Sequence, residues 1–377
     1  MESFLEKRVF PHPVRDQIMQ ILQSRGPTCD GIVRNFARRV AYLAAVGRSP
    51  ELGPHVATVL RDVTDSPREY RARLWLAGIT LSEDVVHVSD SLSFRRATRQ
   101  DLQKRVRVEG VPSGPPDWQG RILFSCIAEC KVVTPRPAEL QTHVDRLITA
   151  LRLFRLGSVS AARCDFQADS FSMFSNWRIG SPQRVTRLAY TMSADDGPRL
   201  LQATQSLMPL LPSAFQFPAI KPSFLSTALA WYSESLMAAG PVEGAVAWAV
   251  ACLEALFLGD NPTTEISYRL TQRVIALLRC FGCAPLDVKQ VVKAAYDVRS
   301  KHVHGATPKK PLSREKLGAL HRNIAEYARV SCLVWTQLLT ERKRNEVLAT
   351  LEEALIDDAS NKRLQQWCAK VDFAGKR

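Results

Sequence analysis

The sequence predicts an α+β chain in which a mixed N-terminal domain with antiparallel β-strands precedes an all-α helical bundle. Apolar residues alternate with polar or small ones between residues 72 and 133, and they recur every three or four positions from about Phe224 onward. With 377 residues, 46% of them hydrophobic, each domain can bury its own core. We expect domains at 1–215 and 224–356, because the segment 208–223 between them contains four prolines and no clear period.

The first domain combines both periodicities. Helical spacing predicts three helices, at 16–22, 32–46 and 139–157. Alternation predicts three strands, at 72–81, 83–94 and 121–133. Residues 158–200 contain short alternating runs whose order the pattern does not determine.

The second domain shows helical spacing throughout, interrupted where Gly or Pro occurs in AAGP, GDNPT, CFGCAP and HGATPKKP. The expected helices cover residues 224–239, 242–258, 265–280, 285–300, 314–341 and 343–356.

Positive charge is spread along the chain, whose formal net charge is +14. Residues 1–220 contain 29 basic and 21 acidic residues, a balance of +8, and residues 221–377 contain 22 and 16, a balance of +6. A polyanionic partner such as RNA is compatible with this balance, although positive charge alone does not identify one.

Neither a membrane span nor a secretory signal is expected, because no stretch of about 18 apolar residues lacks charges and the start is not basic-then-apolar. These features predict a cytoplasmic protein whose nine cysteines stay reduced. Cys280 and Cys283 form a CFGC pair that could bind zinc or act in redox chemistry, but no second pair at matching spacing accompanies it. We therefore interpret it as a plain loop, with metal binding as the alternative, and expect neither metal nor cofactor.

The stretch YDVRSKHVHG, which begins at Tyr296, carries two of the seven histidines beside an arginine and ends at a glycine. Two helix-like segments precede it, AWAVACLEALFLG and EISYRLTQRVIALL. Together they resemble, in the same order, the helices and the Arg, any four residues, His signature of the Apea-like HEPN domains. This resemblance covers roughly residues 224–341.

The resemblance implies a helical bundle that dimerises and, in many members, cleaves RNA without a metal ion. Arg299 and His304 would then be the catalytic pair, with Glu254, Ser300, His302, Arg273 and Lys309 as supporting or RNA-contacting residues. Glu254 would orient Arg299, with a purely structural ion pair as the alternative, and an exposed position is equally compatible with the pattern around Arg273. Members of the family without activity bind RNA or partner proteins.

The residue types fit this chemistry independently. A histidine titrates near neutral pH and can move the proton of an RNA 2′-hydroxyl. An arginine stays charged and can stabilise the extra negative charge of the phosphorane-like transition state. A simpler alternative is a basic helix end that complements the helix dipole.

The spacing of the motif carries a geometric constraint. Positions five apart on a continuous helix point about 140° apart, so Arg299 and His304 would not share a face. The helix must therefore end near His304, for which Gly305 is suitable, or the two residues must act across a dimer. His302 would lie closer to the face of Arg299 and is the alternative base.

The N-terminal domain contains no phosphate-binding glycine motif. A mixed region ahead of the helical part resembles the layout of single-chain Apea-like defence proteins, and this resemblance implies a sensor or specificity role for it, with a phage-derived or host trigger. Its basic run at 95–107 is either a nucleic-acid contact or a solvated surface. The leading hypothesis is an endoribonuclease of a bacterial defence or toxin-like system, such as antiviral abortive infection. The alternatives are a non-catalytic dimeric HEPN module that binds RNA or a partner protein, and a metal-binding regulator based on CFGC.

Overall fold

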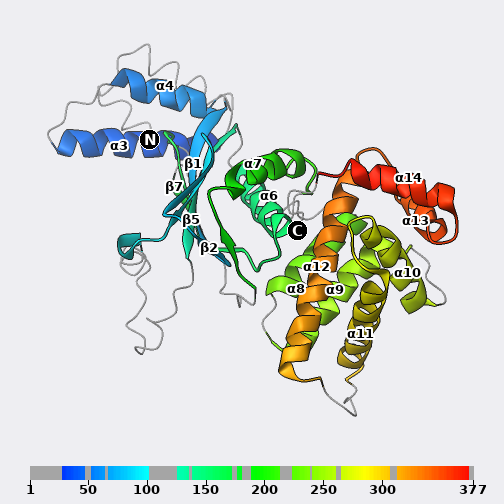
Figure 1. Cartoon of the computed structure of the whole chain (residues 1–377). Coiled ribbons are helices and arrows are strands. Elements are labelled where there is room, and N and C mark those ends of the chain that lie inside the picture. Colours follow the sequence, from blue (N-terminus) through cyan, green and yellow to red (C-terminus); the bar gives the residue numbers. More distant parts are fainter. Residues whose placement is uncertain are drawn as a thin grey trace. The chain divides into compact units, whose positions relative to one another are not determined.

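The computed structural model describes most of the chain (Figure 1). The chain divides into two compact units. The described residues are 28–46, 52–63, 67–101, 125–135, 138–171, 176–180, 188–212, 223–237, 240–259, 265–305 and 312–372. The first unit comprises Met1–Leu74, Glu129–Leu140 and Arg163–Gly180, and the second comprises Trp75–Ala128, Gln141–Ala162 and Ser181–Arg377. The predicted α+β class is confirmed, because strands precede a region whose described elements are all helices.

Six strands form one sheet in the order β3-β4-β5-β1-β6-β7. Their bounds are β1 Arg68–Ala77, β3 Val85–Ser89, β4 Leu92–Arg96, β5 Cys126–Thr134, β6 Ser160–Gln167 and β7 Asn176–Gly180. The pairs β3–β4 and β6–β7 are antiparallel, with Val86 opposite Phe94 and Cys164 opposite Ile179. Burial alternates along the first part of β1, but Leu74, Trp75 and Leu76 are buried in succession, so the predicted period of two does not continue to the end of the strand.

Two predicted strands differ from the observed ones. The expected strand at 83–94 is wrong, because β3 and β4 are two strands joined at Asp90 and Ser91. The expected strand at 72–81 breaks at Gly78, whose φ is +82°, and continues as β2 (Ile79–Leu81). A Cβ atom at Gly78 would lie 2.4 Å from the carbonyl oxygen of Ser158, so both the backbone angle and the space require glycine there. Strand β2 pairs in parallel with β8 (Tyr190–Met192).

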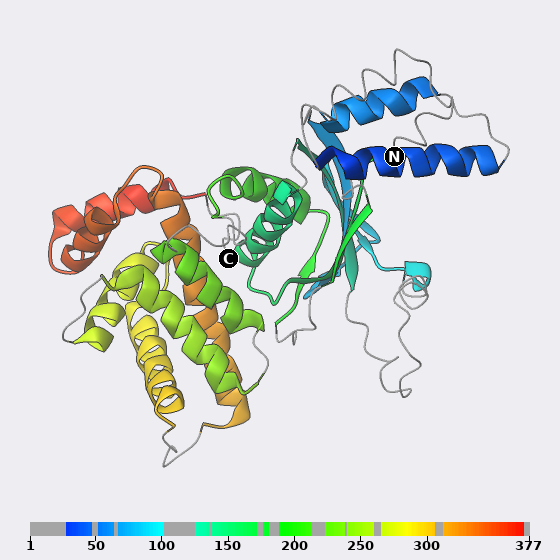
Figure 2. The ribbon, with the colours of Figure 1, turned by 180° about the vertical axis from the view of Figure 1, so that it is seen from behind.

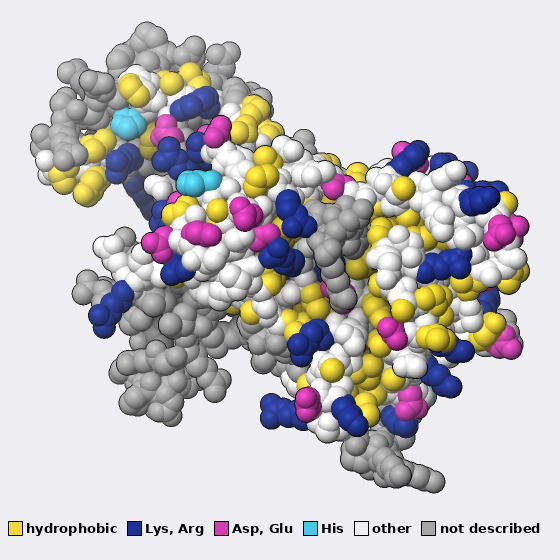
Figure 3. Space-filling view, viewed as in Figure 1, with side chains coloured by type: hydrophobic (Ala, Val, Ile, Leu, Met, Phe, Trp, Pro, Cys, Tyr) yellow, Lys and Arg dark blue, Asp and Glu magenta, His cyan; other side chains and the backbone are white. Residues whose placement is uncertain are grey.

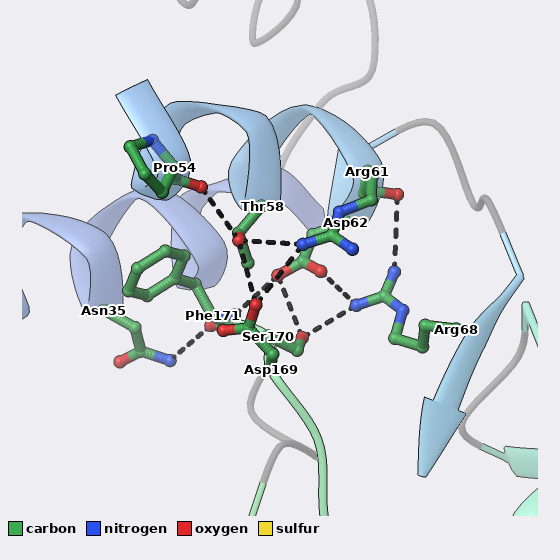
Figure 4. A network of polar contacts seen from close by, with 9 residues as sticks. All are labelled: Asn35, Pro54, Thr58, Arg61, Asp62, Arg68, Asp169, Ser170 and Phe171. Atoms are coloured by element: carbon green, nitrogen blue, oxygen red, sulfur yellow. Dashed lines mark hydrogen bonds and ion pairs between the residues drawn. The ribbon is translucent and has the colours of Figure 1, made fainter. Parts of the chain in front are cut away.

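A buried ionic network stabilises the first unit, where α4 (Leu52–Val63) and α3 (Thr28–Ala45) accompany the strands (Figure 4). Arg68 of β1 pairs with Asp62 of α4, and the two residues are only 8% and 5% exposed. Ser170 Oγ and the Phe171 backbone N–H donate to Asp62 Oδ2 at 2.9 and 2.6 Å. Because a buried charge is costly unless it is paired, this network favours one position of α4 relative to the strands of its unit.

Helix α6 (Ala138–Phe154) packs against the helical region within the second unit, to which α7 (Asp196–Leu207) also belongs. Arg329, which is 3% exposed, donates to the carbonyl oxygens of Leu153 and Phe154 at 2.5 and 3.4 Å. Tyr232 Oη donates to the Arg152 carbonyl oxygen at 2.9 Å. These bonds go to carbonyl groups in the last turn of α6, the part of a helix where such groups need partners from outside it.

The helical region consists of α8 (Phe224–Met237), α9 (Val242–Phe257), α10 (Ile266–Arg279), α11 (Pro285–Val303), α12 (Arg314–Leu338), α13 (Arg344–Glu353) and α14 (Asp358–Ala369). The six predicted helices correspond to α8–α13, whereas α14 was not predicted. Trp335 of α12 is fully buried, and Phe224 of α8 and Phe257 of α9 pack edge-on against it, with ring centroids 5.6 and 6.0 Å away. In the view of Figure 2, α8, α9 and α11 lie in front of α12.

No helix in the described part of the chain is both long enough and apolar enough to cross a bilayer. The expected helix at 16–22 and most of the expected linker at 208–223 lie outside the described residues, and the domain boundary there stays a prediction.

Candidate functional site

The motif of an arginine, any four residues and a histidine occupies the end of α11. The helix ends at Val303, and His304 follows as its C-cap residue with φ −89° and ψ 2°. The His304 N–H donates to the Ser300 carbonyl oxygen at 3.1 Å, and Gly305 adopts a φ of +64°. This left-handed glycine is a common helix stop, and α11 ends immediately before His304, which is one of the two arrangements that the spacing of the motif allows.

Arg299 contacts α9, the helix that contains the LEALF run. Its Nη2 donates to Glu254 Oε2 of α9 at 3.0 Å, and the two side chains are 29% and 18% exposed. The Arg299 guanidinium carbon also lies 5.9 Å from the centroid of the Tyr296 ring. The structure therefore pairs the arginine of the motif with the glutamate of the LEALF run, which both interpretations of Glu254 require.

Burial sets the electrostatic state of Glu254. Removal from water raises the pKa of its carboxyl group, and the neighbouring positive charge and hydrogen bond of Arg299 only partly oppose that rise. The carboxylate is therefore less stable here than in water.

Arg299 and Glu254 line an open pocket of about 530 Å³, together with Tyr296. Arg344, the first residue of α13, also lines this pocket. Arg344 Nη2 donates to the carbonyl oxygens of Ala255 and Leu258 at 2.9 and 2.5 Å, and its guanidinium carbon lies 4.1 Å from the centroid of the Phe224 ring. Two guanidinium groups on one pocket make it suitable for a phosphate.

Arg344 is a site residue that sequence reasoning missed. It lies in the charged run ERKRNEV, where nothing distinguishes it from its basic neighbours. Only the tertiary packing of α13 against the end of α9 brings it to the pocket.

The two histidines of the motif lie at the exposed end of α11. A Cβ atom added at Gly244 of α9 would lie 3.5 Å from His302 Nε2, so the His302 ring lies over that glycine. His304 is exposed and Ser300 is half-buried. Across the described ranges, no hydrogen bond joins Arg299 to either histidine.

Arg273 is buried rather than exposed. Its side chain is 4% exposed, donates to the Phe257 carbonyl oxygen, and binds Glu352 of α13 at 2.5 Å. Burial raises the pKa of Glu352, but hydrogen bonds from Arg269 and Arg273 outweigh that and hold the pKa below its usual value. Arg273 thus stabilises the junction of α9, α10 and α13, which leaves it little surface for RNA. Lys309 lies outside the described residues.

The CFGC pair follows α10 directly, as the loop interpretation requires. Cys280 is the C-cap residue of α10, and Gly282 has a φ of +82°. Cys280, Cys283 and Cys368 of α14 line a groove of about 990 Å³. In Figure 3, Lys and Arg side chains are spread over the drawn face rather than gathered in one patch. A hydrogen bond from the Cys368 thiol, aided by the charge of Arg279, lowers the pKa of Cys280 although burial opposes it. In the described ranges, no group of three or more His, Cys, Asp or Glu side chains is arranged to hold a metal ion.

Part of the basic run at 95–107 is engaged within the protein. Arg95 donates to both carboxylate oxygens of Asp101, at 2.7 and 3.1 Å. Arg96 donates to the carbonyl oxygens of Leu81 and Ser82. The remainder, 102–107, lies outside the described residues, and a nucleic-acid contact by the run stays a prediction.

Comparisons of the chain with protein-family models, curated proteins and solved structures found no match. The family resemblance therefore depends on the residues of the motif and its preceding helices, and the functional argument depends on their geometry.

Proposed function

We propose that the chain is a metal-independent endoribonuclease of a bacterial defence or toxin-like system, acting in the cytoplasm with Arg299 and His304 as its catalytic pair. The observation that carries this proposal is the Arg299–Glu254 pair on the wall of an open pocket, near a helix end that exposes His304. A preformed arginine and an accessible histidine are the two groups that phosphate-centred chemistry without a metal requires.

The reaction follows from the two side chains. His304 would take the proton of the RNA 2′-hydroxyl, whose oxygen attacks the adjacent phosphorus. Arg299 would stabilise the negative charge that builds on the phosphorane-like transition state. Departure of the 5′-oxygen, after it gains a proton, leaves a 2′,3′-cyclic phosphate and a 5′-hydroxyl.

One His304 in each chain cannot act as both base and acid in the same step. A homodimer through the helical region would bring two copies of the motif together and supply both groups. In this proposal the N-terminal domain senses a phage-derived or host trigger that activates the dimer.

The second candidate is a non-catalytic dimeric module that binds RNA or a partner protein. The engagement of Arg299 by Glu254 favours it, because a paired guanidinium offers less free charge to a transition state. Binding of RNA phosphates would still be possible at the pocket that Arg299 shares with Arg344.

The two candidates are separated by incubating the full-length protein with single-stranded RNA in excess EDTA. The catalytic proposal expects cleavage that survives chelation and yields 2′,3′-cyclic phosphate ends. Intact RNA with a measurable dissociation constant supports the binding module instead. Cleavage that requires an added divalent metal would contradict the proposed mechanism. It would favour the alternative in which the CFGC pair binds a metal ion.

A further inference from the structure

Two tryptophans form a stacked pair beside the proposed catalytic site. The rings of Trp231 on α8 and Trp248 on α9 are nearly parallel, with an interplanar angle of 7° and centroids 4.7 Å apart. Trp248 is 36% exposed, although large aromatic side chains are usually more deeply buried. The pair therefore presents aromatic surface to solvent on the helical region.

The pair lies between the two places where the motif touches α9. His302 lies over Gly244, which precedes Trp248 by four residues, about 6 Å along the helix axis and about 40° around it. Arg299 binds Glu254, which follows Trp248 by six residues, about 9 Å along the axis and about 120° around it. Along the helix axis, Trp248 thus lies between the two contacts of α11, and Gly244 is the one near its own face.

On α8, as on α9, the tryptophan lies next to the pocket along the helix. Thr227 lines the pocket that contains Arg299, and Trp231 lies one helical turn further along α8. The two helices are antiparallel here, since Thr227 shares the pocket with Ala255 while Trp231 stacks on Trp248. Pocket, tryptophan pair and His302 therefore follow one another along the α8–α9 pair, which faces the viewer in Figure 2.

We propose that the Trp231–Trp248 pair is a stacking platform for an unpaired base of the RNA bound at the proposed catalytic site. This inference rests on the proposed function and adds a subsite for one unpaired base beside the proposed catalytic residues. Every base has an aromatic face, and a flat indole offers stacking that does not depend on sequence. The phosphates on either side of the stacked base would find hydrogen-bond donors nearby. Arg299 and Arg344 lie at one end of the α8–α9 pair, and His302 lies at the other.

The test is equilibrium binding in EDTA to a labelled 2′-fluoro RNA strand, which lacks the nucleophilic hydroxyl, and to its duplex. Trp248→Ala should weaken single-strand binding about 5- to 150-fold, since stacking on an aromatic side chain contributes about 1–3 kcal/mol per base. Duplex binding should change less than about twofold, because paired bases are already stacked. Trp248→Phe should retain most of the affinity, and Tyr268→Ala, which removes an aromatic side chain that is 62% exposed on α10, should bind as the parent does.

A measurement on the unaltered protein guards against misfolding of the variants. A strand carrying a single 2-aminopurine should lose fluorescence on binding, because stacking on an indole quenches it. Unchanged single-strand affinity in Trp248→Ala, or equal loss for strand and duplex, would overturn the platform. So would light scattering that shows Trp248→Ala to be monomeric and the parent dimeric, since a second copy would then cover the pair.

The outcome is independent of cleavage. Trp248-dependent binding without any cleavage would reject the proposed enzyme and keep the platform. Cleavage that depends on Arg299 and His304, with unchanged RNA binding in Trp248→Ala, would support the proposed enzyme and reject the platform.

Discussion

Arg299 donates a 3.0 Å hydrogen bond to Glu254 across the α9–α11 interface. The guanidinium group that we propose stabilises the transition state is therefore already paired with a carboxyl group of the same chain. Such a pair fixes the direction of the guanidinium before RNA binds, which favours catalysis. It also partly neutralises the guanidinium, which opposes catalysis. Substitutions of Glu254 distinguish these effects.

Glu254→Ala should lower the cleavage rate about 10- to 100-fold, because Arg299 loses the partner that orients it. RNA affinity should change little or rise slightly, since the freed arginine keeps its charge. Glu254→Gln, which retains an acceptor oxygen of the same shape, should recover part of the rate. Single-turnover kinetics with separate affinity measurements test this, and a parent-like rate in Glu254→Ala would leave only a structural ion pair.

The raised pKa of Glu254 also predicts how stability depends on pH. Burial makes the folded chain hold this proton more tightly than the unfolded chain does. The resulting stabilisation is complete below the unfolded pKa, about 4.3, and is lost as the pH rises through the folded pKa. The stability of the parent relative to Glu254→Gln should therefore fall with rising pH in urea unfolding between about pH 4 and 8. A rise would show that Arg299 outweighs burial.

Arg329 tests the packing of α6 against the helical region. Arg329→Ala removes hydrogen bonds to the Leu153 carbonyl and to Glu326 from a side chain that is 3% exposed. We expect a loss of about 3 kcal/mol in the free energy of unfolding. Arg322→Ala, on the exposed side of the same helix, should change stability by less than about 0.5 kcal/mol. Equal effects of the two substitutions would contradict the assigned role.

The geometry of α11 predicts that catalysis needs two chains. Arg299 is turned toward α9, whereas His304 lies beyond the last helical residue. If the base is His304 of one protomer and the acid is His304 of the other, a mixed dimer of the parent and His304→Ala holds only one of the two groups. After subunit exchange with about a ninefold excess of His304→Ala, cleavage per parent chain should therefore fall about tenfold, because most parent chains are then in mixed dimers. Cleavage per parent chain that stays unchanged, or a purely 42 kDa species in light scattering, would contradict the two-chain site.

Local pattern predicted the helical region well because its signals are local. Pro285 and Gly305 border α11 at the positions expected from the sequence, and Gly305 has the positive φ that a helix stop requires. The break at Gly78 was missed, because an alternating apolar run continues across it. That break depends on the close approach of the Ser158 carbonyl, which is distant in sequence.

The candidate site was predictable in part for the same reason. The pairing of Glu254 with Arg299 was expected from the family resemblance, not from spacing, since the two residues are far apart in the chain. Arg344 and the Trp231–Trp248 pair were missed because only tertiary packing brings them to the motif. The pattern around Arg273 allowed an exposed position, but its side chain is buried against the end of α9 and Glu352.

The central claim is tested most directly by single-turnover cleavage rates in excess EDTA for the parent, Arg299→Ala, His302→Ala and His304→Ala. His304→Ala should cleave about 10²- to 10⁴-fold more slowly, the range for one positioned proton-transfer group, with a much smaller change in RNA affinity. Arg299→Ala should cleave more slowly and bind RNA more weakly, because the Arg299 guanidinium contacts the phosphate in both the ground state and the transition state. His302→Ala should lose less rate than either. If all three variants cleave as the parent does, or if His302→Ala abolishes cleavage while His304→Ala retains it, the assignment of Arg299 and His304 as the catalytic pair is wrong.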